Sequence, residues 1–207
     1  ILNRLIDKDR ISNEEKEQTL KCITDVDQIS EFSKADFVIE AIIEDLEIKK
    51  TLFKSLSKII TEDCILATNT SSLSVTNLAS SSINPGRFLG VHFFNPAPLM
   101  PLVEVIPALQ TDAKVLENVI SMLNDWKKTP VIAKDTPGFI VNRIARPFYG
   151  EALRIYEEGI ADFHFIDESL RQGGFRMGPF ELMDFIGNDV NYAVTKSVFE
   201  AFYFDPR

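Results

Sequence analysis

The sequence predicts an α/β fold, in which a doubly wound sheet is followed by an all-α domain. Short apolar, β-branched segments alternate with segments of helical apolar spacing as far as about residue 135. Beyond KDTPG at 134–138, strand signals cease and helical segments continue to the end of the chain. We therefore expect two domains, residues 1–134 and residues 135–207.

The first domain opens with helices. Apolar residues at helical spacing predict a helix within residues 1–10. SNEE at 12–15 has the Ser-x-x-Glu form of a capping box, which predicts a second helix to about Ile23. ADFVIEAII at 35–43 is a short, β-branched run typical of a buried strand, and apolar residues then recur at helical spacing over 48–60.

Strands and helices alternate through the rest of this domain. The further apolar runs predicted as strands are CILATN at 64–69, RFLGVHFF at 87–94, LVEVI at 102–106 and PVIAKD at 130–135. A Ser/Thr-rich turn and a short helix follow the first of these runs, and Thr111 is predicted to cap a helix before the last. The alternation favours a sheet that is largely parallel at first.

The second domain reads as helices only. The helical segments lie at 139–158, about 165–172, 179–186 and 189–203. Gly159 fits the position just past the end of the first, where a left-handed backbone is common.

Composition excludes several functional classes. The chain has 207 residues, 45% apolar residues and a net charge of −9, which argues against binding to nucleic acid or to an anionic membrane. Two cysteines are too few for a disulfide framework, and no apolar run approaches membrane-spanning length. With no secretory signal visible, we expect a cytoplasmic protein.

GVHFFNPAPLMPLVEV at 90–105 places a histidine and an isolated glutamate in otherwise apolar strands. If strands 87–94 and 102–106 pair antiparallel, His92 falls directly opposite Glu104. Opposed Cβ atoms lie roughly 4.5–5.5 Å apart, so the carboxylate can bind one imidazole nitrogen. That bond fixes the tautomer and leaves the other nitrogen to face a substrate. A structural histidine beside a solvent-facing glutamate is the alternative for this stretch alone.

Several motifs together resemble the L-3-hydroxyacyl-CoA dehydrogenases. In chain order these are FVIEAIIEDLEIKK, ATNTSSLSVTNLA, HFFNP, LVEV, DTPGFIVNR and MGPFELMDFIG. The likeness runs from about residue 35 to about residue 190. It implies a Rossmann-type domain, a helical domain and an enzyme that passes hydride between NAD and carbon 3 of an acyl-CoA in fatty-acid β-oxidation.

The resemblance also implies roles for single residues. His92 matches the catalytic acid/base, and Glu104 matches the carboxylate that orients it. Ser71 and Asn142 match polar groups around the reacting oxygens, although Ser71 is also a plausible helix cap. No metal is implied.

For the cofactor, the resemblance implies that Glu44 and Lys49 match positions near the nicotinamide ribose and that Asn95 lies by the nicotinamide. Ser71 is also expected to contact the cofactor. An ordinary charged first helical turn is the alternative for Glu44 and Lys49. The resemblance further implies an acyl-CoA substrate and a homodimer formed through the helical domain.

One feature of the family is absent from this sequence. The family holds the dinucleotide on a glycine-rich strand–turn–helix, but the first glycine here is Gly86. We therefore expect a chain that is incomplete at both ends and that, by itself, binds NAD poorly and turns over little. The alternatives are a related hydroxy-acid dehydrogenase with a non-CoA substrate, or a catalytically silent fragment that keeps the fold. Short-chain and 3-hydroxyadipyl-type substrates both remain open, as do NAD and NADP.

Overall fold

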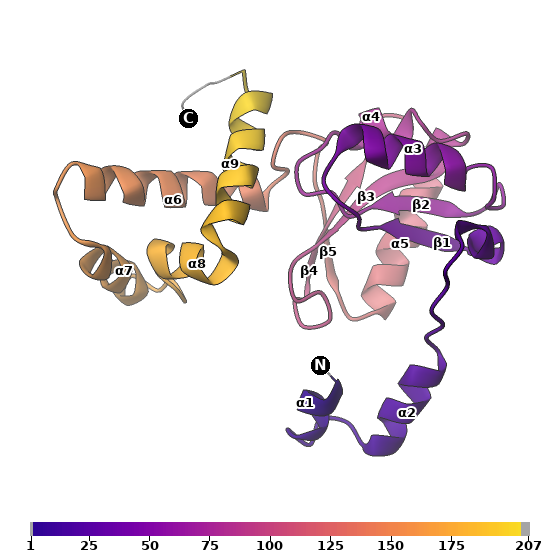
Figure 1. Cartoon of the computed structure of the whole chain (residues 1–207), viewed down its shortest axis with the longest axis horizontal. Helices are drawn as coiled ribbons and strands as arrows, with labels where there is room; N and C mark the ends of the chain where they lie inside the picture. The colour runs from indigo at the N-terminus through magenta and orange to yellow at the C-terminus, as the bar shows by residue number, and fades with distance from the viewer. Residues whose placement is uncertain (1, 204–207) are drawn as a thin grey trace.

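The computed structural model describes residues 2–203 and has two parts (Figure 1). One part is a sheet with helices on both faces, and the other is a group of helices. The strands of the described residues are β1 (Phe37–Glu40), β2 (Ile65–Thr68), β3 (Phe88–Phe93), β4 (Leu102–Pro107) and β5 (Thr129–Ile132). This architecture confirms the predicted fold class.

The sheet has the order β1-β2-β3-β4-β5. The pairs β1/β2, β2/β3 and β4/β5 are parallel, and β3/β4 is antiparallel. The sheet is therefore parallel at first, as the alternation of elements predicts. The carboxyl ends of β1, β2 and β3 consequently share one edge, which is where open α/β sheets bind ligands.

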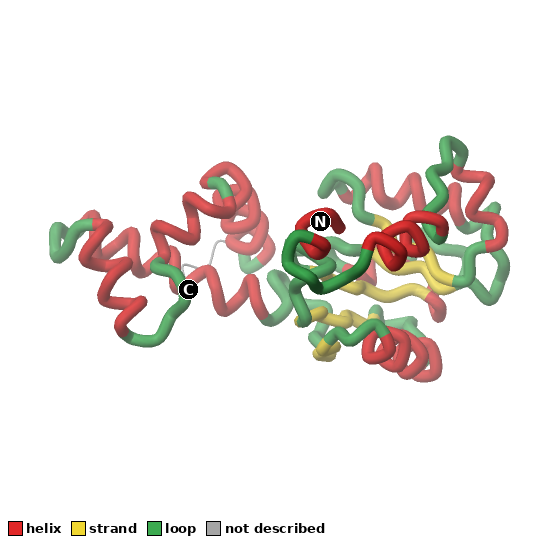
Figure 2. The backbone as a smooth tube through the Cα atoms, turned by 90° about the horizontal axis from the view of Figure 1, so that it is seen from below, coloured by secondary structure: helices red, strands yellow, loops and turns green. Residues whose placement is uncertain are grey.

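Helices cover both faces of the sheet (Figure 2). α3 (Leu46–Leu56) and α4 (Val75–Ala79) pack on one face, and α5 (Ala113–Asp125) packs on the other. Phe53 and Phe88 lie in the core on the first face, and Val91 and Leu123 lie in the core on the second. β3 and β4 are buried on both faces and therefore read as nearly continuous apolar runs, whereas β5 is largely exposed.

Two short helices precede the sheet, α1 (Leu2–Ile6) and α2 (Asn13–Lys21). The predicted capping box is confirmed: the Ser12 hydroxyl accepts from the Glu15 N–H, and the Glu15 carboxylate accepts from the Ser12 N–H. A 3₁₀ helix, η1 (Ile29–Lys34), then leads into β1, and a second, η2 (Pro85–Arg87), precedes β3.

The predicted cap at Thr111 is wrong. Asp112 occupies the N-cap position of α5. The Thr111 hydroxyl instead donates to the Phe88 carbonyl at 2.6 Å and accepts from the Ala108 N–H at 2.8 Å. A hydroxyl that lies beside a strand end binds those backbone groups in preference to the helix that follows it.

The second part contains α6 (Val141–Glu157), α7 (Phe163–Gln172), α8 (Pro179–Ile186) and α9 (Asn188–Ala201). Gly159 follows α6 with φ of +69°, as predicted. The buried Asp167 carboxylate on α7 accepts from the N–H groups of Phe180 and Glu181, so it satisfies the start of α8. None of the helices among residues 2–203 combines the length and the apolar character that crossing a membrane requires.

Candidate active site

His92 and Glu104 form a buried pair at the carboxyl end of β3. The antiparallel register places them directly opposite each other, which confirms the predicted pairing. His92 Nδ1 lies 2.7 Å from Glu104 Oε2, and both residues are at most 6% exposed. A bond of this length between an imidazole and a buried carboxylate fixes which ring nitrogen carries the proton.

The second oxygen of Glu104 reaches the other part of the molecule. Glu104 Oε1 accepts from the N–H of Ile140 at 2.8 Å and from the N–H of Val141 at 2.9 Å. Gly138 and Phe139 approach this point with φ of +73° and +47°. A left-handed phenylalanine costs about 1–3 kcal/mol, so this turn is held in place by its surroundings. The carboxylate therefore links the acid/base candidate to the start of α6.

Glu104 stays ionised although it is buried. Burial by itself raises the pKa of a carboxyl group, but the hydrogen bonds from His92 and from the Val141 and Ile140 N–H groups outweigh it. The net effect is a Glu104 pKa below its ordinary value. The ionised form is the one that stabilises a positive charge on the imidazole.

The ring of His92 lies between aromatic side chains. Ring centroids lie 4.6 Å away for Phe94 and 5.9 Å away for Phe139. No hydrogen bond engages Nε2 of His92 within residues 2–203. This nitrogen can therefore take up or release a proton in an environment from which water is largely excluded.

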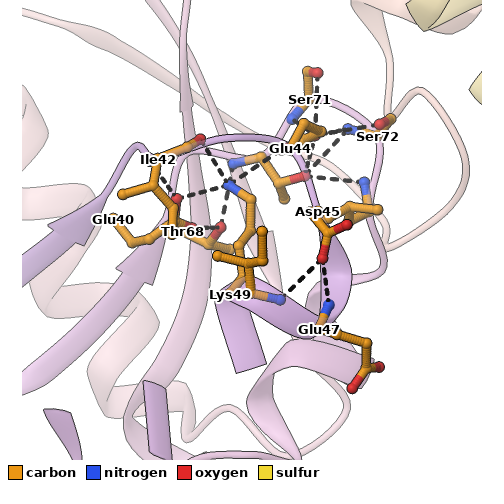
Figure 3. A network of polar contacts seen from close by, with 12 residues as sticks. Glu40, Ile42, Glu44, Asp45, Glu47, Lys49, Thr68, Ser71 and Ser72 are labelled. Carbon is orange, nitrogen blue, oxygen red and sulfur yellow. Dashed lines mark hydrogen bonds and ion pairs between the residues drawn. The ribbon is translucent and has the colours of Figure 1, made fainter. Parts of the chain in front are cut away.

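The turn after β2 is organised by one carboxylate (Figure 3). Glu44 Oε1 accepts from five donors: the Thr70 hydroxyl, and the N–H and hydroxyl groups of Ser71 and Ser72. The shortest of these bonds is 2.6 Å, from Thr70. Ser71 and Ser72 thus do not cap α4, whose N-cap is Ser74.

The ammonium group of the buried Lys49 lies next to this carboxylate (Figure 3). Lys49 Nζ lies 2.6 Å from Glu40 Oε1 and 3.1 Å from Glu44 Oε2. Burial raises the pKa of Glu44, whereas the hydrogen bond from Thr70, the charge of Lys49 and the Ser71 N–H lower it. The lowering effects prevail, so Glu44 is a carboxylate below the pH at which glutamate ordinarily ionises.

The amide of Asn142 connects α6 to the same turn. Its Nδ2 donates to the Ser71 carbonyl oxygen at 3.4 Å. Asn95, in contrast, is exposed beyond β3 and forms no hydrogen bond with another predicted site residue. The structure therefore groups Glu44, Lys49, Ser71 and Asn142 in one set of polar contacts and His92 with Glu104 in another, and it leaves Asn95 exposed. The two sets adjoin at the start of α6, where Asn142 directly follows the two residues whose N–H groups bind Glu104.

Glu40 is the site-region residue that the sequence prediction missed. It ends β1 with 3% exposure, and its Oε2 accepts from the Thr68 hydroxyl at 2.7 Å. The signal was present in the sequence: Glu40 in FVIEAI is an isolated carboxylate in an apolar run, as Glu104 is in LVEVI. The described residues contain no cluster of His, Cys, Asp and Glu that would hold a metal ion.

A basic hollow lies beside the loop that follows β3. It has a volume of about 370 Å³ and is lined by Arg4, Lys8, Arg10, Leu5, Pro96 and Leu99. Three cationic side chains from the start of the chain therefore face the segment just beyond His92. In a chain of net charge −9, this is a local site suited to an anionic group.

Two family models together match almost the whole chain. The model described as 3-hydroxyacyl-CoA dehydrogenase, NAD binding domain, matches residues 1–136. The model described as 3-hydroxyacyl-CoA dehydrogenase, C-terminal domain, matches residues 138–207.

Similar proteins carry names from the same family. A 3-hydroxyadipyl-CoA dehydrogenase of Escherichia coli K12 is 49% identical over 100% of this chain and 44% of its own length. The pig mitochondrial hydroxyacyl-coenzyme A dehydrogenase is 48% identical over 84% of this chain and 56% of its own length. A crystal structure of an E. coli K12 3-hydroxybutyryl-CoA dehydrogenase superposes with a TM-score of 0.96 and 48% identity, over 99% of this chain and 44% of that one. The chain thus spans about half the length of these relatives.

We predict that Glu104→Gln makes the free energy of unfolding less dependent on pH in the acidic range. The pKa of Glu104 is lowered by folding, so its ionised form adds stability above the ordinary pKa, and this stability is lost as the pH falls through the folded value. The variant should lose about 1.5–3 kcal/mol near neutral pH. Its deficit relative to wild type should shrink below about pH 4.5.

Urea unfolding at a series of pH values measures this difference. Glu117→Gln on α5 is the matched control, because the Glu117 side chain is 68% exposed. A deficit for Glu104→Gln that stays constant from neutral to acidic pH would contradict the prediction.

Proposed function

The chain belongs to the 3-hydroxyacyl-CoA dehydrogenase family, and we propose that it supplies the acid–base groups for NAD-dependent oxidation of L-3-hydroxyacyl-CoA to 3-oxoacyl-CoA and for the reverse reduction. The observation that carries the proposal is the buried His92–Glu104 pair at the carboxyl end of β3. Asn142, which directly follows the two residues whose N–H groups bind Glu104, donates to the Ser71 carbonyl oxygen. This combination fits proton transfer at a carbon–oxygen bond better than a purely structural role.

In the proposed oxidation, His92 Nε2 takes the proton of the 3-hydroxyl group as hydride leaves carbon 3. Glu104, bound to Nδ1 at 2.7 Å, stabilises the imidazolium that forms. In the reduction, the same nitrogen returns the proton to the oxygen at carbon 3. The Ile140 and Val141 N–H groups keep Glu104 in place throughout.

Ser71 and Asn142 are proposed to bind the oxygens of the substrate. Ser71 lies on the turn after β2, and Asn142 lies in the first turn of α6. Their contact means that the substrate groups between them would be held from both parts of the molecule. Such positioning is a main source of rate acceleration.

The residues at the carboxyl ends of β1 and β2 fit a nicotinamide nucleotide. The Glu44 side chain is 36% exposed, so its carboxylate can accept from ribose hydroxyl groups. The exposed Ile42 beside it offers an apolar surface for a ring. We propose Glu44, Ser71 and Asn95 as contacts, with Lys49 supporting Glu44 through their ion pair. The bound nucleotide supplies the hydride acceptor, and the chain's own side chains handle the proton.

The basic hollow is proposed to bind the phosphates of the CoA moiety. Arg4, Lys8 and Arg10 face Pro96 and Leu99, which follow the strand that carries His92. Cations with apolar neighbours suit a ligand that combines phosphates with a pantetheine arm. This hollow favours a CoA ester over a free hydroxy acid, which carries no phosphate.

The helical part is proposed to form a homodimer. Its exposed apolar side chains include Ile144, Phe175, Phe185 and Tyr192. A hollow of about 620 Å³ lies along α6 and is walled by Ile144, Phe148, Phe175 and Leu182, among others. Apolar surfaces of this kind usually meet a partner, and a two-fold symmetric dimer would pair this face with the same face of a second copy.

We also propose that the chain has two domains, divided at residue 135, with separate functions. Residues 1–134 would hold the nucleotide and the acid/base pair, and residues 135–207 would close the substrate site and dimerise. The two cysteines are free thiols, which supports a reducing compartment such as the cytoplasm.

The full product of the gene should catalyse NADH-dependent reduction of acetoacetyl-CoA, and His92→Gln should lower kcat by about 10²–10⁴-fold. The imidazole is the proposed proton donor, and an amide cannot replace it. NADH absorbance measures the rate.

His164→Gln, at the exposed histidine on α7, is the control that should keep the parent rate. An active parent whose His92→Gln variant retains more than about a tenth of the rate would contradict the role of His92. An inactive parent would favour the catalytically silent alternative.

Replacing Lys8 by Gln should raise the KM for acetoacetyl-CoA by about tenfold and leave kcat nearly unchanged. Loss of one charge-assisted contact to a phosphate has about this effect on binding. Steady-state kinetics measure it, with Lys114→Gln on the exposed side of α5 as control. If Lys8→Gln and Lys114→Gln have the same KM, the hollow is not part of the substrate site.

Ile144→Asp should convert the dimer into a monomer, because a carboxylate on an apolar face cannot be buried without a partner. Analytical ultracentrifugation of the parent and the variant measures the masses. Ile83→Asp, at an exposed position of the sheet domain, should leave the mass at that of the dimer. A monomeric parent would rule out the proposed dimer.

A further inference from the structure

Lys49 is a buried cation whose position has no explanation in the packing of α3 alone. The residue is 1% exposed, and lysine is almost never buried to this degree unless it is paired. Removing an ammonium group from water costs several kcal/mol, which only well-placed carboxylates offset. Glu40 and Glu44 provide them, at 2.6 and 3.1 Å.

Glu40 fixes Lys49 from the strand side (Figure 3). Its side chain is fully buried, and Oε1 accepts from Lys49 Nζ and from the Ile42 N–H at 2.7 Å. Its Oε2 accepts from the Thr68 hydroxyl at 2.7 Å. The carboxylate therefore ties the end of β1 to the end of β2 and leaves the ammonium little freedom to move.

Glu44 connects Lys49 to the turn after β2. The two oxygens of its carboxylate have separate partners: Oε2 faces Lys49, and Oε1 faces the donors of Thr70, Ser71 and Ser72. A half-exposed glutamate without the ammonium could rotate or turn into solvent. With Oε2 held by Lys49, Oε1 stays beneath the turn.

The charges also explain why the turn is stable in this form. Lys49 carries one positive charge against the two carboxylates, so the surplus negative charge rests on the more exposed Glu44. That charge is satisfied by the N–H and O–H groups that converge on Oε1. Convergent donors of this kind bind an ionised oxygen about twice as strongly as a neutral one.

From these contacts we propose that Lys49, held by Glu40, is a positioning residue that sets the Ser71 turn through Glu44. Its effect on catalysis rests on the proposed function, because it acts by placing Ser71, a proposed substrate-binding residue, against Asn142. Its effect on the turn does not depend on that function. The two effects are therefore tested separately.

The first test measures amide hydrogen exchange of residues 70–72 in the full product of the gene. Lys49→Met should speed exchange of the Ser71 and Ser72 amides by about tenfold, the effect of losing about one ordinary hydrogen bond of protection. Lys50→Met is the matched control, since Lys50 neighbours Lys49 on α3 but, within residues 2–203, forms its ion pair with the exposed Glu47 alone. Equal exchange in wild type and Lys49→Met would overturn the proposal.

A second variant guards against loss of folding. Lys49→Met leaves Glu40 buried without its cation, whereas Glu40→Gln combined with Lys49→Met leaves neither charge unpaired. The amide oxygen that replaces the Glu40 carboxylate can still accept from the Ile42 N–H or the Thr68 hydroxyl. The double variant should show the same fast exchange at 70–72, and protection equal to wild type would overturn the proposal.

The second test is a double-mutant cycle on kcat. Lys49→Met should lower kcat by about tenfold in the wild-type background and by less than about twofold in a Ser71→Ala background, because its effect passes through Ser71. A structural role would lower stability and leave equal effects in both backgrounds, which would overturn the catalytic half of the proposal. If the parent enzyme is inactive, the proposed function fails, and the exchange result alone decides the role of Lys49.

Discussion

The carboxylate of Glu104 is the interaction on which the rest of the site depends. One oxygen binds His92, and the other binds the backbone N–H groups that begin α6. A buried carboxylate with either oxygen unsatisfied would be costly, so both sets of partners are needed at once. The imidazole tautomer and the junction between the sheet and the helices are therefore fixed by the same group, and the turn at Phe139, with φ of +47°, leads directly into those N–H groups.

Glu44 has a similar arrangement at the turn after β2. It uses one oxygen for the ammonium group of Lys49 and the other for backbone and hydroxyl donors of a loop. Each carboxylate thus ties an irregular segment to a buried side chain, His92 on β3 or Lys49 on α3. Because loops have few regular hydrogen bonds of their own, such carboxylates give a site on loops the precision that strands have by themselves.

The sequence predicted the fold class and the central pair for a physical reason. Residues opposite each other in an antiparallel pair follow from the strand positions alone, so His92 and Glu104 could be matched before any coordinates. Two contacts could not be predicted in this way: the one between Glu44 and the turn at residues 70–72, and the one between Glu44 and Lys49. They depend on how the loop after β1 packs against the loop after β2, and hydrophobic periodicity does not encode that packing. Thr111 shows the same limit, because its hydroxyl donates to the carbonyl of a strand residue, Phe88, and does not cap the helix that follows. Glu40 was predictable by the isolated-carboxylate signal that identified Glu104, yet it stood in a strand assigned only to the core.

A crystal structure of the full gene product with NAD⁺ and acetoacetyl-CoA tests the central claim most directly. The account predicts that the oxygen at carbon 3 lies about 2.6–3.2 Å from His92 Nε2, while Nδ1 keeps its bond to Glu104. An acetoacetyl group whose carbon 3 oxygen is bound away from His92, with Nε2 facing no substrate atom, would contradict the acid–base assignment.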